Sequence, residues 1–296
     1  MAKVSVLIPS FNQPELLDRT LNSVFNQSYK DYEVIVTDDS TNTDLIRQVA
    51  LKYPGKINYF HNEVPLGSPG NWNFAISKAT GEYIKFIHHD DYLTSEYSLE
   101  KYVSLLDDNA DADLGFSATD IKNSDQELIR TNCPGSNEVR LLRENPFLIF
   151  PENIIGAPSA TIYRRKVNKF FDIKLKWVVD IDFYLEILNE NSNIAYTQEA
   201  LVCTTCGSPH QITSQCKNNS QVEFFEWSYL YNKILDNYPK VDKKSLCRSY
   251  NKLIKKLMKK YKIMSLSKFS EMMEGELSLT MKYLLALNQI RTILKR

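Results

Sequence analysis

Residues 4–40 read VSVLIPSFNQPELLDRTLNSVFNQSYKDYEVIVTDDS, in which a strand, a helix and a second strand are expected to follow one another. The apolar runs VSVLIP and YEVIV are short, continuous and rich in β-branched residues, which is typical of strands covered on both faces. Between them Leu16, Leu17, Leu21 and Val24 recur with helical spacing, and Pro14 suits a helix start. The stretch therefore predicts one β-α-β unit.

The same alternation continues through about the first 100 residues. It predicts an α/β fold with a doubly wound, mostly parallel sheet flanked by helices and right-handed crossovers. The further elements that we expect are a helix in 43–53, a strand in 57–62, a helix in 71–79 and a strand in 81–91.

Composition excludes several classes of protein. The 296 residues are 43% hydrophobic, and 36 basic residues balance 36 acidic ones. This predicts a globular protein with a sizeable core and no overall charge that would attract nucleic acid. No apolar run approaches the ~20 residues of a membrane-spanning helix, and the apolar start before Pro9 is too short for a signal peptide. We expect a cytoplasmic protein whose five cysteines are free thiols.

Polar residues stand where the predicted strands end. The first strand ends in PSFN, the second in Asp38-Asp39-Ser40 and the fourth in His88-His89-Asp90-Asp91. Ligands of such sheets bind at the carboxyl ends of the strands, and two pairs of neighbouring carboxylates there require a cation or hydrogen-bond donors. The alternative is that the acids cap helices, Asp91 the helix after it and Ser40 or Asp39 the helix near Asp44.

The residues after the first strand narrow the nature of the ligand. PSFNQPELL contains no glycine, so backbone amides cannot approach phosphates as they do in dinucleotide sites and P-loops. The charge of a bound diphosphate would then have to be neutralised by a divalent ion held by Asp90 or Asp91.

Residues 4–40 and the segment GSPGNWNFAISKATGEYIKFIHHDD (67–91) resemble the nucleotide-binding half of the glycosyltransferase family 2 enzymes, which have the GT-A fold. The resemblance implies a nucleotide-sugar donor, usually a uridine diphosphate (UDP) sugar. It also implies donor-binding residues: Pro9, Phe11 and Asn12 along the nucleotide, Asp39 at the base and Asn73 in the family's Asn-containing helix.

By the same resemblance Asp90 and Asp91 occupy the family's Asp-x-Asp region. One of them is implied to hold the ribose and the other a divalent metal, Mn²⁺ or Mg²⁺; we assign Asp90 to the donor and Asp91 to the metal, and the reverse assignment is the alternative. The chain departs from the family where His88 or His89 stands in the place of a usual acid, and His89 is assigned to the ribose or phosphate. The alternative for both histidines is that they only close the strand with hydrogen bonds. Trp72 stands where the family commonly has a basic residue and is expected to pack between helix and sheet.

The second half is expected to bind the acceptor. NIIGAPSATIYRRKV (153–167) resembles the family's segment beside the transferred sugar, with Gly156, Pro158 and Ser159 as its wall, although these residues also suit a simple turn. In LKWVVDIDFYLEILNEN (175–191) the resemblance implies that Asp180 is the catalytic base, with Val179 where Glu is usual. Trp177 and Asp182 are assigned to the acceptor side. Carboxylates in a first helical turn are also favoured by the helix dipole alone.

VCTTCGSPHQITSQC (202–216) has three interpretations. Cys203, Cys206, His210 and Cys216 have a spacing close to that of structural zinc sites. The family resemblance instead makes His210, with Thr213 and Ser214, part of a lid over the donor and a metal ligand. The third interpretation is that the thiols are incidental.

The tail is basic and amphipathic. Residues 240–262 hold ten Lys or Arg and one acid, Asp242, with apolar residues on one helical face. We expect a helical extension packed on the body, or one lying on an anionic membrane surface, which suits an acceptor carried on a lipid diphosphate. Residues 277–294 are expected to form a further helix that pairs with it or with another copy in a homo-oligomer.

Together these features predict an inverting, metal-dependent glycosyltransferase that moves a sugar from a UDP-sugar to a hydroxyl of an acceptor glycan. The resemblance places it in bacterial O-antigen or capsule synthesis, peripheral to the inner membrane. We expect a nucleotide-sugar-binding half at 1–99, an acceptor-binding half at 100–222 and the helical extension at 223–296. One alternative is a nucleotidyltransferase, although this chain lacks the Gly-rich and basic loop that such enzymes usually have after the first strand. The other is a non-catalytic protein that binds a sugar nucleotide or a glycan.

Overall fold

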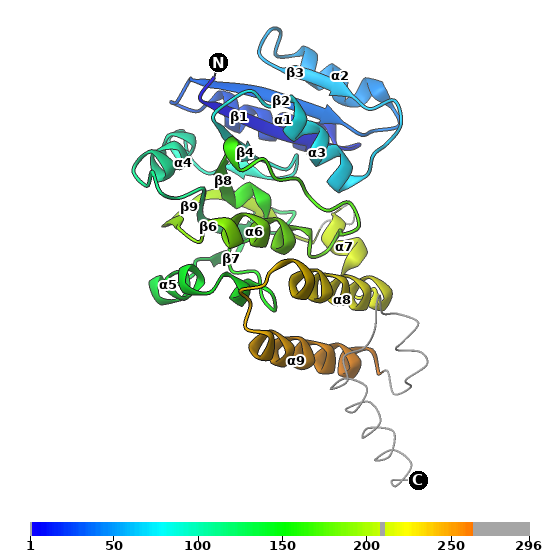
Figure 1. Ribbon diagram of the computed structural model, residues 1–296. Coiled ribbons are helices and arrows are strands. Elements are labelled where there is room, and N and C mark those ends of the chain that lie inside the picture. Colours follow the sequence, from blue (N-terminus) through cyan, green and yellow to red (C-terminus); the bar gives the residue numbers. More distant parts are fainter. Residues whose placement is uncertain (1, 208–210, 263–296) are drawn as a thin grey trace. The chain divides into compact units, whose positions relative to one another are not determined.

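The computed structural model describes residues 2–207 and 211–262, and the chain forms two compact units (Figure 1). The first unit comprises Met1–Lys174 and Val179–Gln211, and the second comprises Leu175–Val178 and Ile212–Arg296. His210 and the segment 277–294 lie outside the described residues, so the expectations for them stay predictions. The predicted borders at 99 and 222 also stay predictions.

The first unit is built on one twisted sheet in the order β3-β2-β1-β4-β8-β6-β9-β5, with β7 paired to β6. The strands β1 to β4 pair in parallel, as predicted. Beyond β4 the sheet is mixed, because β8 runs antiparallel to both β4 and β6 while β6 and β9 are parallel. The strands are β1 (Val4–Ser10), β2 (Tyr32–Asp38), β3 (Asn58–His61), β4 (Tyr83–Phe86), β5 (Tyr92–Leu93), β6 (Leu114–Lys122), β7 (Leu128–Asn132), β8 (Thr161–Arg164) and β9 (Ile194–Thr205).

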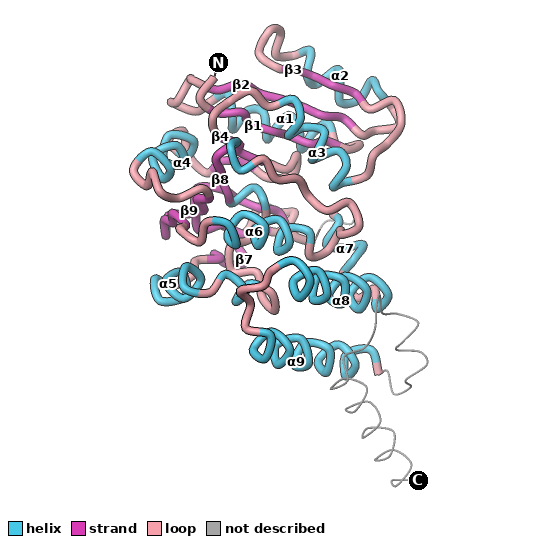
Figure 2. Tube along the Cα trace, viewed as in Figure 1, coloured by secondary structure: helices cyan, strands magenta, loops and turns pink. Residues whose placement is uncertain are grey.

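Helices cover the sheet on both faces, which confirms the α/β prediction (Figure 2). Alternate residues of β1, Val4, Val6 and Ile8, join side chains of α1, α2 and α4 in one core cluster. On the other face α3 contacts β1 and β2, and α6 contributes Phe183, which stacks on Phe171. The helices of this unit are α1 (Pro14–Phe25), α2 (Thr43–Leu51), α3 (Ser68–Lys78), α4 (Ser98–Asp107), α5 (Ser136–Glu144) and α6 (Val179–Glu190), with 3₁₀ turns η1 (Pro146–Ile149), η2 (Pro158–Ala160) and η3 (Arg165–Val167).

The second unit is helical, with α7 (Ile212–Cys216), α8 (Ser220–Asn237) and α9 (Lys243–Tyr261). The predicted amphipathic helix is α9, which begins at an Asp242 cap and buries Leu246, Tyr250, Ile254 and Leu257. Tyr250 stacks on Tyr231 of α8 with ring centroids 4.0 Å apart. No helix in the described part of the chain is long and apolar enough to cross a bilayer.

Glu226 of α8 fixes the short segment 176–178 of the second unit. Its buried carboxylate accepts hydrogen bonds from the backbone N–H groups of Lys176 (3.0 Å), Trp177 (2.7 Å) and Val178 (3.0 Å). Burial raises the pKa of Glu226, although these three donors act in the opposite direction. The carboxylate is therefore held by the backbone of 176–178.

We expect Glu226→Gln to lower the free energy of unfolding by about 2–4 kcal/mol, because an amide offers one oxygen where two accept now and turns its own N–H₂ toward a backbone donor. Urea denaturation followed by circular dichroism measures the change. Asp236→Asn, at an exposed position of the same helix, is the matched control and should change stability by less than about 0.5 kcal/mol. Equal effects of the two substitutions would refute the structural role of Glu226.

Candidate active site

The acidic turn 88–91 comes directly after β4, and its backbone is held by α1. The Thr20 hydroxyl donates to the Asp91 carbonyl at 2.6 Å and shares its hydrogen with the carbonyls of His89 (2.9 Å) and Leu16 (3.1 Å). Arg19 donates to the carbonyl of Asp90 at 2.6 Å, and the Thr205 hydroxyl donates to the same oxygen at 2.9 Å. Three consecutive carbonyls of the turn thus have fixed partners, so the positions of the two aspartates are set before any ligand binds.

Sequence reasoning missed Arg19 and Thr20. The only sign of Thr20 in the sequence is that a polar residue stands beside Leu21 on the apolar side of its helix, where it is fully buried. Because short polar side chains at such positions also hydrogen-bond to their own helix, this pattern alone does not indicate a role.

The helix-capping interpretation of the acidic pairs is wrong. The cap of α2 is Asn42, whose side chain accepts from the backbone N–H of Asp44 at 3.1 Å. α4 begins at Ser98, and the short strand β5 separates it from Asp91. The carboxylates at both strand ends therefore serve something other than the next helix.

Asp90 and Asp91 differ in electrostatic environment. Asp91 is 3% exposed, and burial together with the charge of Asp90 raises its pKa well above the usual range. Burial also acts to raise the pKa of Asp90, but His89 and a 2.9 Å hydrogen bond from Gln211 lower it. Two adjacent carboxyl groups with little access to water repel each other when both are charged, so a cation beside them would be bound favourably.

His88 and His89 contact neighbouring parts of the site. The His88 ring lies against Trp72 with centroids 4.7 Å apart, and burial lowers the pKa of His88 to about 4. The His89 Nδ1 atom lies 3.2 Å from the carbonyl oxygen of Pro9, at the end of β1. Trp72 is 6% exposed and also packs on Phe171, as expected of a residue between helix and sheet.

A fully buried lysine lies beneath the acidic turn. The Lys85 ammonium donates to the carbonyls of Phe86 (3.0 Å) and Ser159, and it lies 4.1 Å from the centroid of the Tyr102 ring. The Ser159 hydroxyl in turn accepts from the backbone N–H of His88 at 2.9 Å. Burial lowers the pKa of Lys85 well below its usual value, an effect that Asp91 partly offsets. The predicted sugar wall at Ser159 is therefore joined directly to the acidic turn.

Asp39 is bound by the loop that leads into α3. Its carboxylate accepts from the backbone N–H groups of Leu66 and Gly67, both at 2.8 Å, and from the Asn62 amide at 2.9 Å. Nearby, the backbone N–H of Asn12 donates to the Ser40 hydroxyl at 2.8 Å. Phe11 is 48% exposed at the end of β1, which leaves the ring open to a planar base.

Asn73 holds a distant backbone segment. Its side chain donates to the carbonyl of Phe171 and accepts from the N–H of the same residue, both at 2.8 Å. Asn71, two residues earlier, is the buried asparagine beside β2, where it donates to the carbonyl of Thr37 at 3.1 Å and accepts from Asn62 at 3.0 Å. The structure thus places two asparagines in this helix with different surroundings.

The remaining predicted residues lie in several places. Pro158 and Ser159 are buried in η2, and Gly156 has a φ of +101°, which favours glycine. Asp180 and Asp182 lie in the first turn of α6, Asp180 half-buried and Asp182 fully buried. Trp177 is half-buried in the second unit.

The donor set fits a hard divalent ion. Asp90 and Asp91 supply carboxylate oxygens, which suit Mn²⁺ and Mg²⁺, and Mg²⁺ in particular is often bound by one or two carboxylates together with substrate phosphates. No group of three or more His, Cys, Asp or Glu side chains suited to a metal occurs within 2–207 and 211–262. A divalent ion bound by two carboxylates and by the oxygens of a diphosphate is consistent with that observation. Among the cysteines of the zinc interpretation, Cys203 is buried on β9, Cys206 is half-buried and Cys216 lies in the second unit.

Comparisons with known proteins bear on the family and the fold of the chain. The family model described as glycosyl transferase family 2 matches residues 5–171, more than half of the chain. A Campylobacter jejuni protein named GalNAc(5)-diNAcBac-PP-undecaprenol beta-1,3-glucosyltransferase is 39% identical over 98 residues, which are 32% of each chain. The match thus spans about a third of the length of that relative.

Solved structures show the same fold. Staphylococcus aureus TarS 1–349 in complex with UDP-GlcNAc superposes with a TM-score of 0.66 at 21% identity, covering 87% of this chain and 73% of TarS. The mannosyltransferase PcManGT of Pyrobaculum calidifontis, in complex with GDP-Man and Mn²⁺, gives 0.57 at 13% identity over 99% of this chain and 81% of its own. These likenesses show the GT-A fold, and the family match over residues 5–171 establishes that the chain belongs to glycosyl transferase family 2.

Proposed function

We propose that this protein is an inverting, metal-dependent glycosyltransferase that moves a sugar from a UDP-sugar to a hydroxyl of an acceptor glycan. The observation that carries the proposal is the pair of adjacent aspartates, half-buried Asp90 and buried Asp91, in a turn fixed by α1 at the carboxyl end of β4. In an α/β sheet this is where a ligand binds.

The nucleotide is proposed to lie over the ends of β1 and β2. Phe11 offers an exposed ring on which a base stacks, and Pro9, Asn12 and Asp39 belong to the surrounding loops. Asp39 holds the loop 62–67 through three hydrogen bonds, so we propose that Asp39 and this loop bind the base together. His89 and Asp90 are proposed to face the ribose and phosphates, and Asn73 to hold the segment at Phe171.

Asp91, with His210 proposed as a further ligand, would hold Mn²⁺ or Mg²⁺, and the ion supplies positive charge that stabilises the diphosphate as it leaves. Asp180 is proposed to accept the proton of the attacking acceptor hydroxyl. A single carboxylate base without a nucleophilic partner suits direct displacement, which inverts the anomeric configuration. Gly156, Pro158, Ser159, Trp177 and Asp182 are proposed to bound the sugar and the acceptor.

The acceptor is proposed to be a glycan on a lipid diphosphate, in bacterial O-antigen or capsule synthesis. The name of the C. jejuni relative contains an undecaprenol-linked diphosphate, which is an acceptor of this chemistry. The basic face of α9 fits such a setting, because it would bring the chain to an anionic membrane surface at the cytoplasmic side.

The test is a transfer assay on the full chain with Mn²⁺, a panel of UDP- and GDP-sugars and a lipid-diphosphate-linked glycan. We expect acceptor-dependent release of UDP from one sugar nucleotide and a product whose anomeric configuration, read by NMR, is opposite to that of the donor. A nucleotidyltransferase would release no UDP in this assay and would instead form a UDP-sugar and inorganic diphosphate when given UTP and a sugar 1-phosphate. Donor binding without any release, with every acceptor, would indicate a binding protein.

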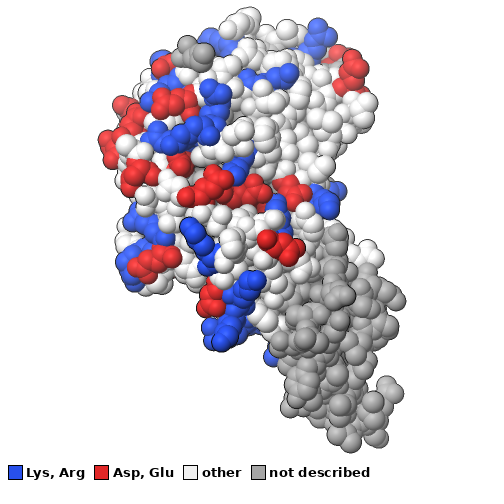
Figure 3. Space-filling model, viewed as in Figure 1, with Lys and Arg blue, Asp and Glu red and all other residues white. Residues whose placement is uncertain are grey.

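α9 provides a separate prediction about membrane association. Its exposed face carries a row of basic residues, and Figure 3 shows Lys and Arg side chains over the part of α9 visible in that view. We expect Lys252→Glu with Lys256→Glu to weaken binding to phosphatidylglycerol-containing vesicles by at least about 10-fold, because each basic residue near such a surface contributes on the order of 1 kcal/mol. Vesicle sedimentation measures binding. The control, Lys56→Glu with Arg130→Glu, makes the same change in net charge at exposed positions of the first unit.

Equal loss of binding in both double variants would show that net charge, and not α9, governs the interaction. Unchanged binding of the α9 variant would rule out this helix as a membrane-binding surface.

A further inference from the structure

A small pocket lies at the end of β4 opposite to the acidic turn. Its volume is about 260 Å³, and it is bounded by the last turn of α3, the strands β4 and β8, and the segment after η3. The acidic turn 88–91 comes after the carboxyl end of β4, whereas Ile84 of the pocket lies near the amino end of that strand. The pocket is therefore distinct from the candidate active site.

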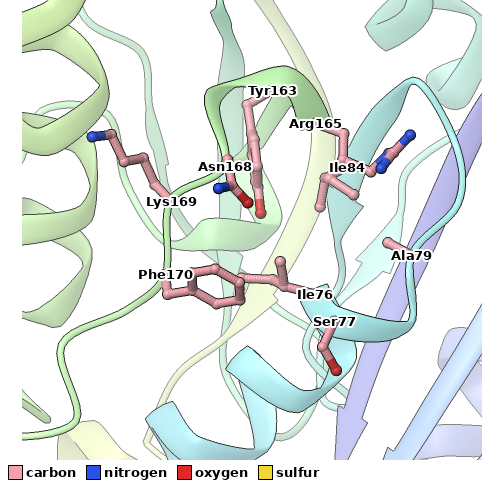
Figure 4. Close-up of a pocket in the computed structure, with 9 residues that line it drawn as sticks. All are labelled: Ile76, Ser77, Ala79, Ile84, Tyr163, Arg165, Asn168, Lys169 and Phe170. Carbon is pink, nitrogen blue, oxygen red and sulfur yellow. The ribbon is translucent and has the colours of Figure 1, made fainter.

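The interior of the pocket combines apolar walls with one unsatisfied hydroxyl. Ile76, Ile84 and Phe170 form its apolar sides, and the Tyr163 side chain points its hydroxyl into the space between them (Figure 4). Tyr163 is 2% exposed, and its hydroxyl has no hydrogen-bond partner among the residues that the structure describes. A buried hydroxyl without a partner is unfavourable, so a ligand that accepts its hydrogen bond removes that penalty.

The charge around the pocket favours an anion. Two of the nine lining residues, Arg165 and Lys169, are cationic, and none of the nine is Asp or Glu. Lys169 pairs with Glu190, and Figure 4 shows its side chain pointing away from the other lining residues. Arg165 donates through Nε to the carbonyl of Gly81 at 2.6 Å, and its two terminal nitrogens have no partner in the described part of the chain. The guanidinium therefore retains donors beside the pocket, and Figure 4 shows it on the side of Ile84 away from the Tyr163 hydroxyl.

We propose that this pocket is a binding site for a small carboxylate with an aromatic or branched aliphatic body, with Tyr163 as hydrogen-bond donor and Arg165 as counter-charge. The volume suits a body of about the size of one aromatic ring, below the range typical of drug-sized ligands. The site is independent of the proposed glycosyl transfer, since it uses none of the residues assigned to that reaction.

The test uses benzoate as the probe and the methyl groups of Ile76 and Ile84 as reporters in the full chain. We expect saturable shifts of both methyl resonances in ¹³C-methyl NMR spectra as benzoate is added, and at least about 5-fold weaker binding of benzyl alcohol, which lacks the charge. Tyr163→Phe should weaken benzoate binding by about 5- to 10-fold, because it removes one hydrogen bond to a charged acceptor and keeps the ring that packs on Phe183.

Ser77→Trp, at an exposed lining position, is expected to fill the mouth and abolish the shifts without loss of folding, which the thermal midpoint of the variant checks. Absence of saturable shifts in the wild-type chain would overturn the proposal, as would shifts that persist unchanged in both variants. A Tyr163→Phe chain that melts higher than wild type, together with no benzoate binding by wild type, would show that the hydroxyl is only a packing defect.

Discussion

Asp91→Asn is expected to lower kcat/KM for sugar transfer by about 10³-fold, without lowering the stability of the metal-free protein. The two results have one cause. Burial and the charge of Asp90 raise the pKa of Asp91, so the folded chain already disfavours its ionised form, and a neutral amide of the same shape removes that unfavourable charge. The same amide is a poor ligand for a divalent ion and cannot supply the charge that holds it beside a diphosphate.

Two measurements check this prediction. Steady-state transfer rates give the loss in kcat/KM, and thermal unfolding with and without Mn²⁺ and UDP gives the ligand-dependent stabilisation, which should be present in wild type and lost in Asp91→Asn. Asp108→Asn, at an exposed position after α4, is the control and should leave both unchanged. An Asp91→Asn chain that is active and still stabilised by Mn²⁺ with UDP would remove Asp91 from the metal site.

The β-α-β part of the fold is predictable because its information is local. Val4, Val6 and Ile8 alternate on a buried strand, and Leu17, Leu21 and Val24 repeat with the period of a helix, so each element is encoded within its own residues. Parallel strands also carry their polar ends to one edge, which is why the sequence alone locates the acidic turn. The mixed pairing of β8, β6 and β9 depends on contacts between distant segments and has no such local pattern.

The partners of the site residues are less predictable, for a physical reason. Lys85 lies within an apolar strand pattern, and nothing in YIKF indicates that its ammonium is buried against the carbonyl of Ser159, 74 residues later. The family resemblance assigns Asp39 to the base, but its hydrogen bonds to the loop at Leu66 and Gly67 depend on how that loop folds back. Residue type indicates which groups need partners, whereas only the folded chain shows which partners they have.

Asp180→Asn is expected to lower kcat by about 10²- to 10⁴-fold while leaving donor binding intact. A general base acts in the transition state, so its loss reduces the rate and not the affinity for the sugar nucleotide. The competing interpretation is that Asp180 only complements the dipole at the start of α6. In that case the substitution would change stability by about 0.3–1 kcal/mol and leave kcat unchanged, so the two interpretations predict opposite outcomes for the rate.

The experiment compares Asp180→Asn with Glu186→Gln, a half-buried acid further along α6 that removes the same charge away from the first turn. Stopped-time assays give kcat, and the stabilisation of each variant by UDP with Mn²⁺ gives donor binding. We expect only Asp180→Asn to lose turnover. Because we expect stabilisation by UDP and Mn²⁺ to depend on Asp91 and turnover to depend on both aspartates, the pair of variants separates donor binding from proton removal. Full turnover in Asp180→Asn would show that another group acts as the base, and it would not bear on the assignment of the metal site.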